Sequence, residues 1–155
     1  MPIVAVNQPA HIEQVRLLFQ EYWGSFDFAP CFQNFSAELA ALPGDYAPPR
    51  GALALALVDG QPAGCAALRP IDSERCEAKR LYVRPAFRAH GLGKALLDWV
   101  IAEARARGYR ELLGDTMPQM SRALEMYDRM GFERIPPYNA NPTPGVIYIR
   151  LALTP

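Results

Sequence analysis

The residues best suited to bind a charged ligand lie in one stretch, Arg84–Ala95, which reads Arg-Pro-Ala-Phe-Arg-Ala-His-Gly-Leu-Gly-Lys-Ala. It follows an apolar run that predicts a strand and precedes an amphipathic pattern that predicts a helix. Gly91 and Gly93 would let the backbone approach a ligand, and the free N–H groups and dipole of a helix start favour an anion. Arg88 and Lys94 add positive charge beside them. The stretch therefore predicts a phosphate site.

Two common phosphate-binding motifs do not match this stretch. A Walker loop requires glycine five residues before Gly93, where this chain has Arg88. A dinucleotide fingerprint requires Gly or Ala three residues after Gly93, where the chain has Leu96. The pattern that does match is Arg-x-x-Gly-x-Gly, which resembles the acetyl-CoA signature of the GNAT superfamily of N-acetyltransferases.

Two further segments extend the resemblance. Lys79–Pro85 (Lys-Arg-Leu-Tyr-Val-Arg-Pro) resembles the splayed central strand of that family. Met126–Phe132 (Met-Tyr-Asp-Arg-Met-Gly-Phe) resembles its late Leu-Tyr-x-x-x-Gly-Phe element. Order and spacing match across Val58–Phe132, so the chain is identified as a member of this superfamily, of the small bacterial type.

The resemblance implies the fold and the co-substrate. We expect a single GNAT domain over residues 1–155, of the α/β class, with a mixed and mostly antiparallel sheet flanked by helices. Two parallel strands at its centre would splay apart and admit the pantetheine arm of acetyl-CoA, and no metal is expected. The residues implied to hold acetyl-CoA, through strand main-chain groups and through the loop around the pyrophosphate, are Leu81, Tyr82, Val83, Arg88, Ala89, His90, Gly91, Leu92, Gly93 and Lys94.

Acetyl transfer to an amine needs a neutral nucleophile and a proton for the departing thiolate. Glu77 lies eleven residues before Arg88, where several family members hold a glutamate that acts directly or through water, so it is the candidate base. An ordinary ion pair with Lys79, on the same strand face, is the competing interpretation. Tyr127 is the candidate acid, because in similar proteins this tyrosine lies near the thioester sulfur; the alternative is a core aromatic with one hydrogen bond. Family members often carry Asn seven residues earlier, where this chain has Met120.

The elements that must position these residues follow from hydrophobic periodicity. Strands are predicted near residues 3–6, 52–58, 63–68, 76–83, 112–115 and 146–153. Helices are predicted near residues 12–23, 36–42, 91–107 and 117–130. An antiparallel run followed by alternating strands and helices indicates one mixed α/β domain.

The charge of the chain is balanced overall and uneven locally. The 155 residues hold 16 basic and 16 acidic side chains. Residues 1–68 carry two basic and six acidic side chains, whereas residues 69–94 carry seven basic and three acidic ones. A local basic band suits a small anion, and a nucleic-acid partner is not expected because such proteins are usually basic overall. The aromatic-rich segment 22–46, which holds Glu21 at its edge and Asp27, Glu38 and Asp45 within it, would suit a cationic amine.

The cellular setting is predicted from what the sequence does not contain. Three cysteines without Cys-x-x-Cys spacing indicate neither a disulfide framework nor a zinc site. The first residues do not resemble a signal peptide, and the longest apolar run, Ala52–Val58, is too short to span a bilayer. We therefore expect a cytoplasmic protein without a membrane partner.

The acceptor and the exact activity stay open at this stage. The acceptor is expected to be a small-molecule or peptide amine: a polyamine-like compound, an amino acid, an antibiotic, or a protein N-terminus or lysine. A homodimer is one expectation, because similar proteins are commonly dimeric. The alternatives are a non-catalytic CoA-binding module, a nucleotide-binding protein, and an acyltransferase that uses another acyl group or a hydroxyl acceptor.

Overall fold

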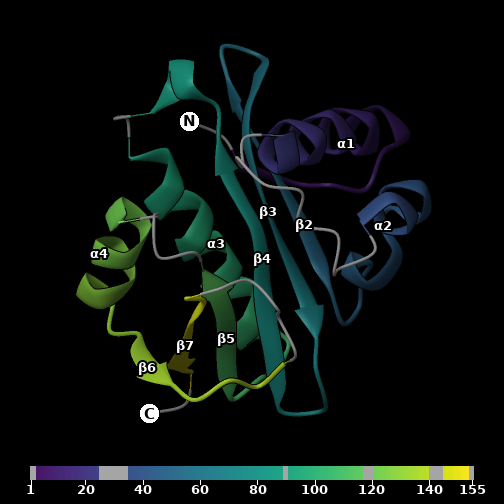
Figure 1. Cartoon of the computed structure of the whole chain (residues 1–155). Coiled ribbons are helices and arrows are strands. Elements are labelled where there is room, and N and C mark those ends of the chain that lie inside the picture. The colour runs from purple at the N-terminus through teal and green to yellow at the C-terminus, as the bar shows by residue number, and fades with distance from the viewer. Residues whose placement is uncertain (1–2, 25–34, 89–90, 117–120, 140–144, 154–155) are drawn as a thin grey trace.

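The computed structural model describes residues 3–24, 35–88, 91–116, 121–139 and 145–153 as one mixed α/β domain (Figure 1). Its seven-stranded sheet has the order β1-β2-β3-β4-β5-β7-β6, and helices lie on both faces. The strands are β1 (Ile3–Ala5), β2 (Ala52–Val58), β3 (Gln61–Pro70), β4 (Arg75–Val83), β5 (Glu111–Thr116), β6 (Glu133–Ile135) and β7 (Ile147–Ala152). The helices are α1 (Pro9–Gly24), α2 (Phe35–Ala41), α3 (Leu92–Ala106) and α4 (Ser121–Arg129), with short 3-10 turns at Gly44–Tyr46 and Pro85–Phe87.

The pairing of the strands confirms the predicted fold class. Neighbouring strands of this sheet are antiparallel except β4 and β5, which are parallel. The parallel pair lies near the middle of the sheet and is joined through α3, which is the usual way to connect parallel neighbours.

Each face of the sheet buries its own hydrophobic core. Strand β2 shows this directly, because it is buried on both sides and its side chains alternate. Leu53 and Leu55 pack with α1, whereas Ala54 and Ala56 pack with α3. Four leucines or valines of α3 are fully or almost fully buried: Leu92, Leu96, Leu97 and Val100. The small alanines of β2 leave room for these larger side chains.

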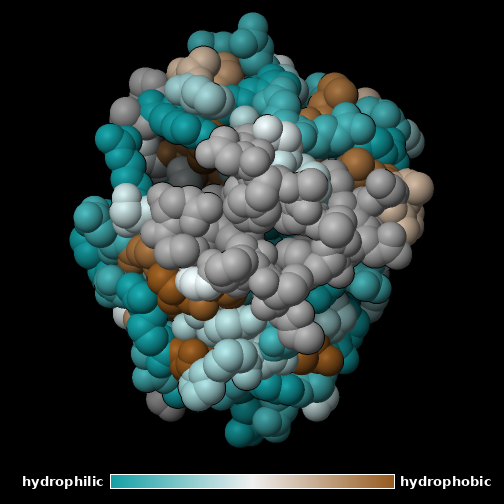
Figure 2. All heavy atoms as spheres, in the orientation of Figure 1, coloured by the Kyte–Doolittle hydropathy of each residue, from teal (hydrophilic) through white to brown (hydrophobic). Residues whose placement is uncertain are grey.

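Helix α4 covers the outer part of the α3 face. Met126, Tyr127 and Met130 pack partly buried against the core on that face. Hydrophobic atoms gather beside α4, while most of the described outer rim is hydrophilic (Figure 2). Residues 117–120, where the sequence predicts the first part of this helix, lie outside the described residues.

One strand was missed by the sequence prediction. Strand β6 pairs antiparallel with β7 and has the sequence Glu-Arg-Ile. Three residues with two exposed charges carry no alternating apolar pattern, so periodicity could not predict this strand. Its pairing with the longer β7 is a tertiary interaction.

Strands β3 and β4 approach each other very closely at Gly64. A Cβ added at Gly64 would lie 2.6 Å from the backbone oxygen of Tyr82. Gly64 is opposite Val83, the last residue of β4, so this close approach fixes the end of the strand that leads into the glycine-containing loop.

We predict that Gly64→Ala destabilises the protein. The new methyl group would push β4 away from β3, and overpacking of this kind costs about 1–3 kcal/mol. Urea denaturation measures the change in the free energy of unfolding. Gly24→Ala is the matched control, because a Cβ there meets nothing within 4 Å; we expect a change within about 0.5 kcal/mol. Equal stability of the Gly64→Ala variant would contradict the close approach.

Candidate active site

The candidate site begins where β4 and β5 part. The two strands pair in parallel at Arg75 with Glu111, Cys76 with Leu112 and Glu77 with Leu113. Strand β4 then continues to Val83 along β3, and β5 continues to Thr116 along β7. Figure 1 shows β4 running on well past the end of β5. The facing edges beyond Glu77 thus present backbone groups that can pair with an extended ligand.

The loop after β4 leads directly into α3. Gly91 has a φ of +72° and precedes the first residue of α3, Leu92. A left-handed φ favours glycine, and a Cβ at Gly91 would meet nothing within 4 Å. The one contact for a Cβ at Gly93 is a Val83 methyl at 3.9 Å. The first N–H groups of α3 have no acceptor within the helix, so this open helix start fits the pyrophosphate of acetyl-CoA.

Two cations stand beside this helix start. Arg88 is exposed, and its Nε donates a hydrogen bond to the Val83 carbonyl at 3.0 Å. Lys94 is exposed and pairs with Asp98 at 2.9 Å. Both side chains can reach an anion at the start of α3. Ala89 and His90, predicted to belong to the same loop, lie outside the described residues.

The strand residues predicted to contact acetyl-CoA contribute their side chains to the two cores. Leu81 and Val83 pack on the α3 face, and Tyr82 packs on the α1 face. The Tyr82 hydroxyl lies 3.4 Å from Oε2 of Glu21. Their main-chain groups are what a pantetheine arm would use, so core packing and ligand contact are compatible at these positions.

Tyr127 packs against the hydrophobic core on the α3 face of the sheet. Its ring packs on Phe132 with the ring centroids 5.5 Å apart. Burial, and to a smaller extent the neighbouring Tyr22, raise the pKa of Tyr127 above its ordinary value. The hydroxyl therefore keeps its proton at neutral pH. It makes no hydrogen bond within the described part of the chain, which leaves it able to donate one to a ligand.

Glu77 lies at the last position where β4 pairs with β5, with 1% of its surface exposed. Arg69 Nε donates to Oε1 at 2.8 Å, and the Tyr138 hydroxyl donates to Oε2 at 2.5 Å. Lys79 Nζ lies 3.9 Å from Oε2, so the ion pair with Lys79 is present. The carboxylate still has acceptor capacity, because an ionised carboxylate offers about four lone-pair sites.

Tyr138 was not predicted to contact Glu77. It follows β6, and its ring also lies against Tyr148 of β7, with the centroids 5.3 Å apart. Burial first, and then the negative charge of Glu77, raise the pKa of Tyr138 well above its ordinary value, so it remains a donor to that carboxylate. In the sequence, Tyr138 is only an aromatic residue in a proline-rich segment near the C-terminus, and this does not predict a contact with a residue 61 positions away.

Arg80 connects the part of β4 that is not paired with β5 to the two N-terminal helices, α1 and α2. It has a φ of +58° at a bulge, where two residues of β4 stand opposite Ala66 of β3. Its guanidinium forms hydrogen bonds of 2.9 and 3.0 Å to the two carboxylate oxygens of Glu38 in α2 and lies 5.0 Å from the ring centroid of Trp23 in α1. A bidentate, buried pair of this kind offsets the cost of the left-handed backbone.

The uneven charge of the sequence is largely neutralised in space. Arg80 pairs with Glu38, and Arg84 pairs with Glu21 at 2.6 Å. Two of the four carboxylates predicted to suit a cationic amine are therefore already bound by arginines of the basic band. Asp45 is exposed, and Asp27 lies outside the described residues.

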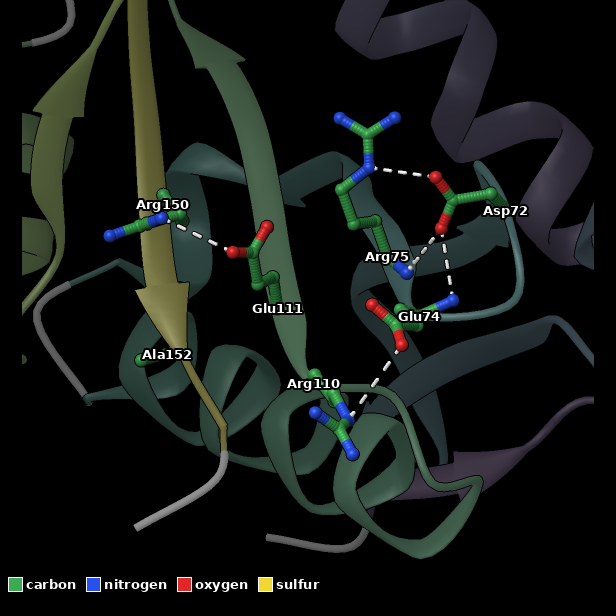
Figure 3. A pocket seen from close by; sticks show the side chains of 7 residues that line it. All are labelled: Asp72, Glu74, Arg75, Arg110, Glu111, Arg150 and Ala152. Atoms are coloured by element: carbon green, nitrogen blue, oxygen red, sulfur yellow. Dashed lines mark hydrogen bonds and ion pairs between the residues drawn. The ribbon is translucent and has the colours of Figure 1, made fainter.

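A polar cavity lies at the opposite end of the parallel pair (Figure 3). It is lined by Asp72, Glu74, Arg75, Arg110, Glu111, Arg150 and Ala152. Its charged side chains are paired with each other, as Arg75 with Asp72 and Arg150 with Glu111 show. This end of β4 and β5 is the paired end, so the cavity is separate from the point where the strands part.

Comparison with known proteins agrees with this geometry. Residues 12–132 match the acetyltransferase (GNAT) family. An uncharacterised N-acetyltransferase of Schizosaccharomyces pombe is 36% identical over 154 residues, which cover 98% of this chain and 94% of that protein.

Solved structures show the same fold. An acetyltransferase from Streptococcus agalactiae superposes with a TM-score of 0.80 at 21% identity, covering 98% of each chain. An acetyltransferase from Salmonella typhimurium, solved with acetyl-CoA, superposes with a TM-score of 0.74 at 19% identity, covering 99% of this chain and 94% of that one.

We predict that Glu38→Gln strongly destabilises the protein. Its partner Arg80 has a side chain only 4% exposed, and removing one member of a buried ion pair costs about 3–5 kcal/mol. Chemical denaturation measures the loss. The control is Glu74→Gln, whose pair with Arg110 is more than 60% exposed on both sides and is expected to contribute about 0–1 kcal/mol. A similar small effect of both substitutions would show that the Arg80–Glu38 pair does not hold β4 to α2.

Proposed function

Because this chain belongs to the acetyltransferase (GNAT) family, we propose that it transfers the acetyl group of acetyl-CoA directly to a primary amine. One observation carries the proposal: β4 parts from β5 after Glu77, and the parted end of β4 leads into the loop that opens α3. The parted strand offers main-chain groups to an extended amide-containing arm, and the helix start beside it offers N–H groups to a pyrophosphate. Pantetheine and pyrophosphate are joined in this order in acetyl-CoA.

In this proposal the main-chain groups of Leu81–Val83 pair with the pantetheine arm. The pyrophosphate lies on the start of α3, with Arg88 and Lys94 beside it, and Ala89 and His90 belong to the same loop. The Arg88 guanidinium, which bonds the Val83 carbonyl in this structure, turns toward the phosphates. That carbonyl then becomes available to the pantetheine arm.

The chemistry is divided between the two faces of the sheet. Glu77 lies on the α1 face and accepts a proton from the acceptor amine, directly or through water. The amine nitrogen forms a bond to the acetyl carbon as the carbon–sulfur bond breaks. Tyr127 gives its hydroxyl proton to the departing thiolate and regains one from solvent. Holding both substrates together supplies much of the rate, so no covalent enzyme intermediate is needed.

The direct test incubates the purified protein with acetyl-CoA and a panel of primary amines, and measures free thiol. Thiol release that depends on both the protein and an amine supports the proposal. Acetyl-CoA binding without thiol release for any amine would favour a non-catalytic CoA-binding module. A faster reaction with a longer acyl-CoA, or with a hydroxyl acceptor, would favour the alternative of an acyltransferase that uses another acyl group or a hydroxyl acceptor.

Glu77→Gln and Tyr127→Phe are each predicted to lower kcat by about 10²- to 10⁴-fold, because each removes one proton-transfer group. Steady-state thiol release measures the rate, and calorimetry should show acetyl-CoA affinity unchanged.

Because burial raises the pKa of Tyr127 above its ordinary value of 10.0, the profile of wild-type kcat against pH should show no loss from ionisation of Tyr127 below pH 10.0.

Two substitutions control for burial and charge. Tyr109→Phe removes a buried hydroxyl that bonds Arg50, and Glu111→Gln removes a carboxylate that pairs with Arg150 at the other end of β5. Both variants should keep the wild-type kcat. Full activity of Glu77→Gln or of Tyr127→Phe would refute the role assigned to that residue.

Arg88→Gln is predicted to weaken acetyl-CoA binding about tenfold, which corresponds to about 1.4 kcal/mol. The effect should shrink as salt is raised, because exposed charges are screened. Titration calorimetry at low and high salt measures both. Arg110→Gln, an exposed arginine at the far end of β5, should leave the affinity unchanged. An Arg88→Gln variant with wild-type affinity at low salt would exclude Arg88 from the pyrophosphate site.

A further inference from the structure

Lys79 is a buried cation without a hydrogen-bond partner among the residues that the structure describes. Its side chain is 4% exposed, and the nearest carboxylate oxygen, Oε2 of Glu77, is 3.9 Å from Nζ. That distance allows charge attraction but is too long for a hydrogen bond. An ammonium group has three donors, and within the described residues Nζ reaches no acceptor.

The carboxylates around Lys79 are bound by other groups. Arg69 and Tyr138 occupy the two oxygens of Glu77. The amide of Asn139 donates to Asp115 at 3.0 Å. Burial lowers the pKa of Lys79, and the negative charges of Glu77 and Asp115 offset this only in part. The ion pair with Glu77 leaves the N–H donors of this ammonium without an acceptor among the described residues, so they can bind an anion that comes from outside the chain.

Lys79 also lies where the acceptor must arrive. It is two residues beyond Glu77 on β4, past the last pairing with β5. Side chains alternate along a strand, so Glu77 and Lys79 share the face that α1 and α2 cover, with Leu113 and Asp115 on β5. The helix start and Tyr127 belong to the opposite face. An amine that reaches Glu77 therefore passes next to Lys79.

We propose that the acceptor carries a carboxylate close to its amine, and that Lys79 binds this carboxylate. The inference rests on the proposed function, since it names the class of acceptor for that site. The binding groups for the two ends, Glu77 and Lys79, are 3.9 Å apart. The amine and the carboxylate of the acceptor must then be separated by few bonds, as in an α-amino acid. A polyamine is disfavoured, because its second ammonium would meet Lys79.

The test compares matched acceptors with the wild-type protein and acetyl-CoA. Each set contains an α-amino acid, its carboxamide and the amine that lacks the carboxylate, together with a γ-amino acid. The α-amino acid should have a kcat/KM at least tenfold above that of its carboxamide, since hydrogen bonds between charged groups contribute more than those between neutral groups. The γ-amino acid should be the poorer of the two amino acids.

Variants of Lys79 separate acceptor recognition from structural support. Lys79→Met should remove the preference for the α-amino acid over its carboxamide, while Lys79→Arg should retain it. A merely structural lysine would lower the rates for both acceptors equally and leave their ratio unchanged, which would overturn the proposal. The wild-type comparison stands even where Lys79→Met does not fold.

The outcomes distinguish this inference from the function on which it rests. Absence of thiol release with every amine overturns the proposed function. Thiol release that is as fast with carboxamides or simple amines as with α-amino acids overturns the inference alone.

Discussion

The parting of β4 from β5 is the constraint on which the rest of the structure depends. Two neighbouring strands with free edges tend to pair, so the separation after Glu77 and Leu113 must be maintained by other contacts. Strand β3 holds β4 on one side, and β7 holds β5 on the other. The bulge at Arg80, with its bonds to Glu38, anchors the free half of β4 to α2. The buried ion pair therefore helps to keep open the place where a ligand's amides can replace strand pairing.

The pairing of charged side chains determines which cations can still bind an anionic ligand. Arg80 of β4 and Arg84, the residue after β4, are bound by Glu38 of α2 and Glu21 of α1, so two charges of the basic band are neutralised by carboxylates of the acidic N-terminal segment. Arg88 and Lys94 remain exposed beside the start of α3. Lys79 remains buried without a hydrogen-bond acceptor in the part of the chain that the structure describes. One group of cations thus suits a solvated diphosphate, and the other suits a single desolvated carboxylate.

The two residues proposed for proton transfer lie on opposite faces of the sheet. On the α1 face, Glu77 accepts hydrogen bonds from Arg69 and Tyr138 and forms an ion pair with Lys79. On the α3 face, Tyr127 is held protonated by burial. In the proposed mechanism the proton acceptor and the proton donor have different environments, because the strands of the sheet lie between them. The amine and the thioester would meet where the strands part.

The sequence by itself determined the class of fold, and it singled out a candidate phosphate-binding loop and candidate roles for Glu77 and Tyr127. Those features are local: a glycine pair at a helix start, the period of an apolar face, and residues at fixed spacing along one strand. Only the tertiary structure decided which charged side chains pair with each other, which ammonium has no hydrogen-bond acceptor among the described residues, and which tyrosine reaches Glu77. Arg80 and Glu38 are 42 positions apart, and Tyr138 and Glu77 are 61 apart. No local sequence pattern predicts such contacts, because they form only when packing and strand register bring distant segments together in the buried interior.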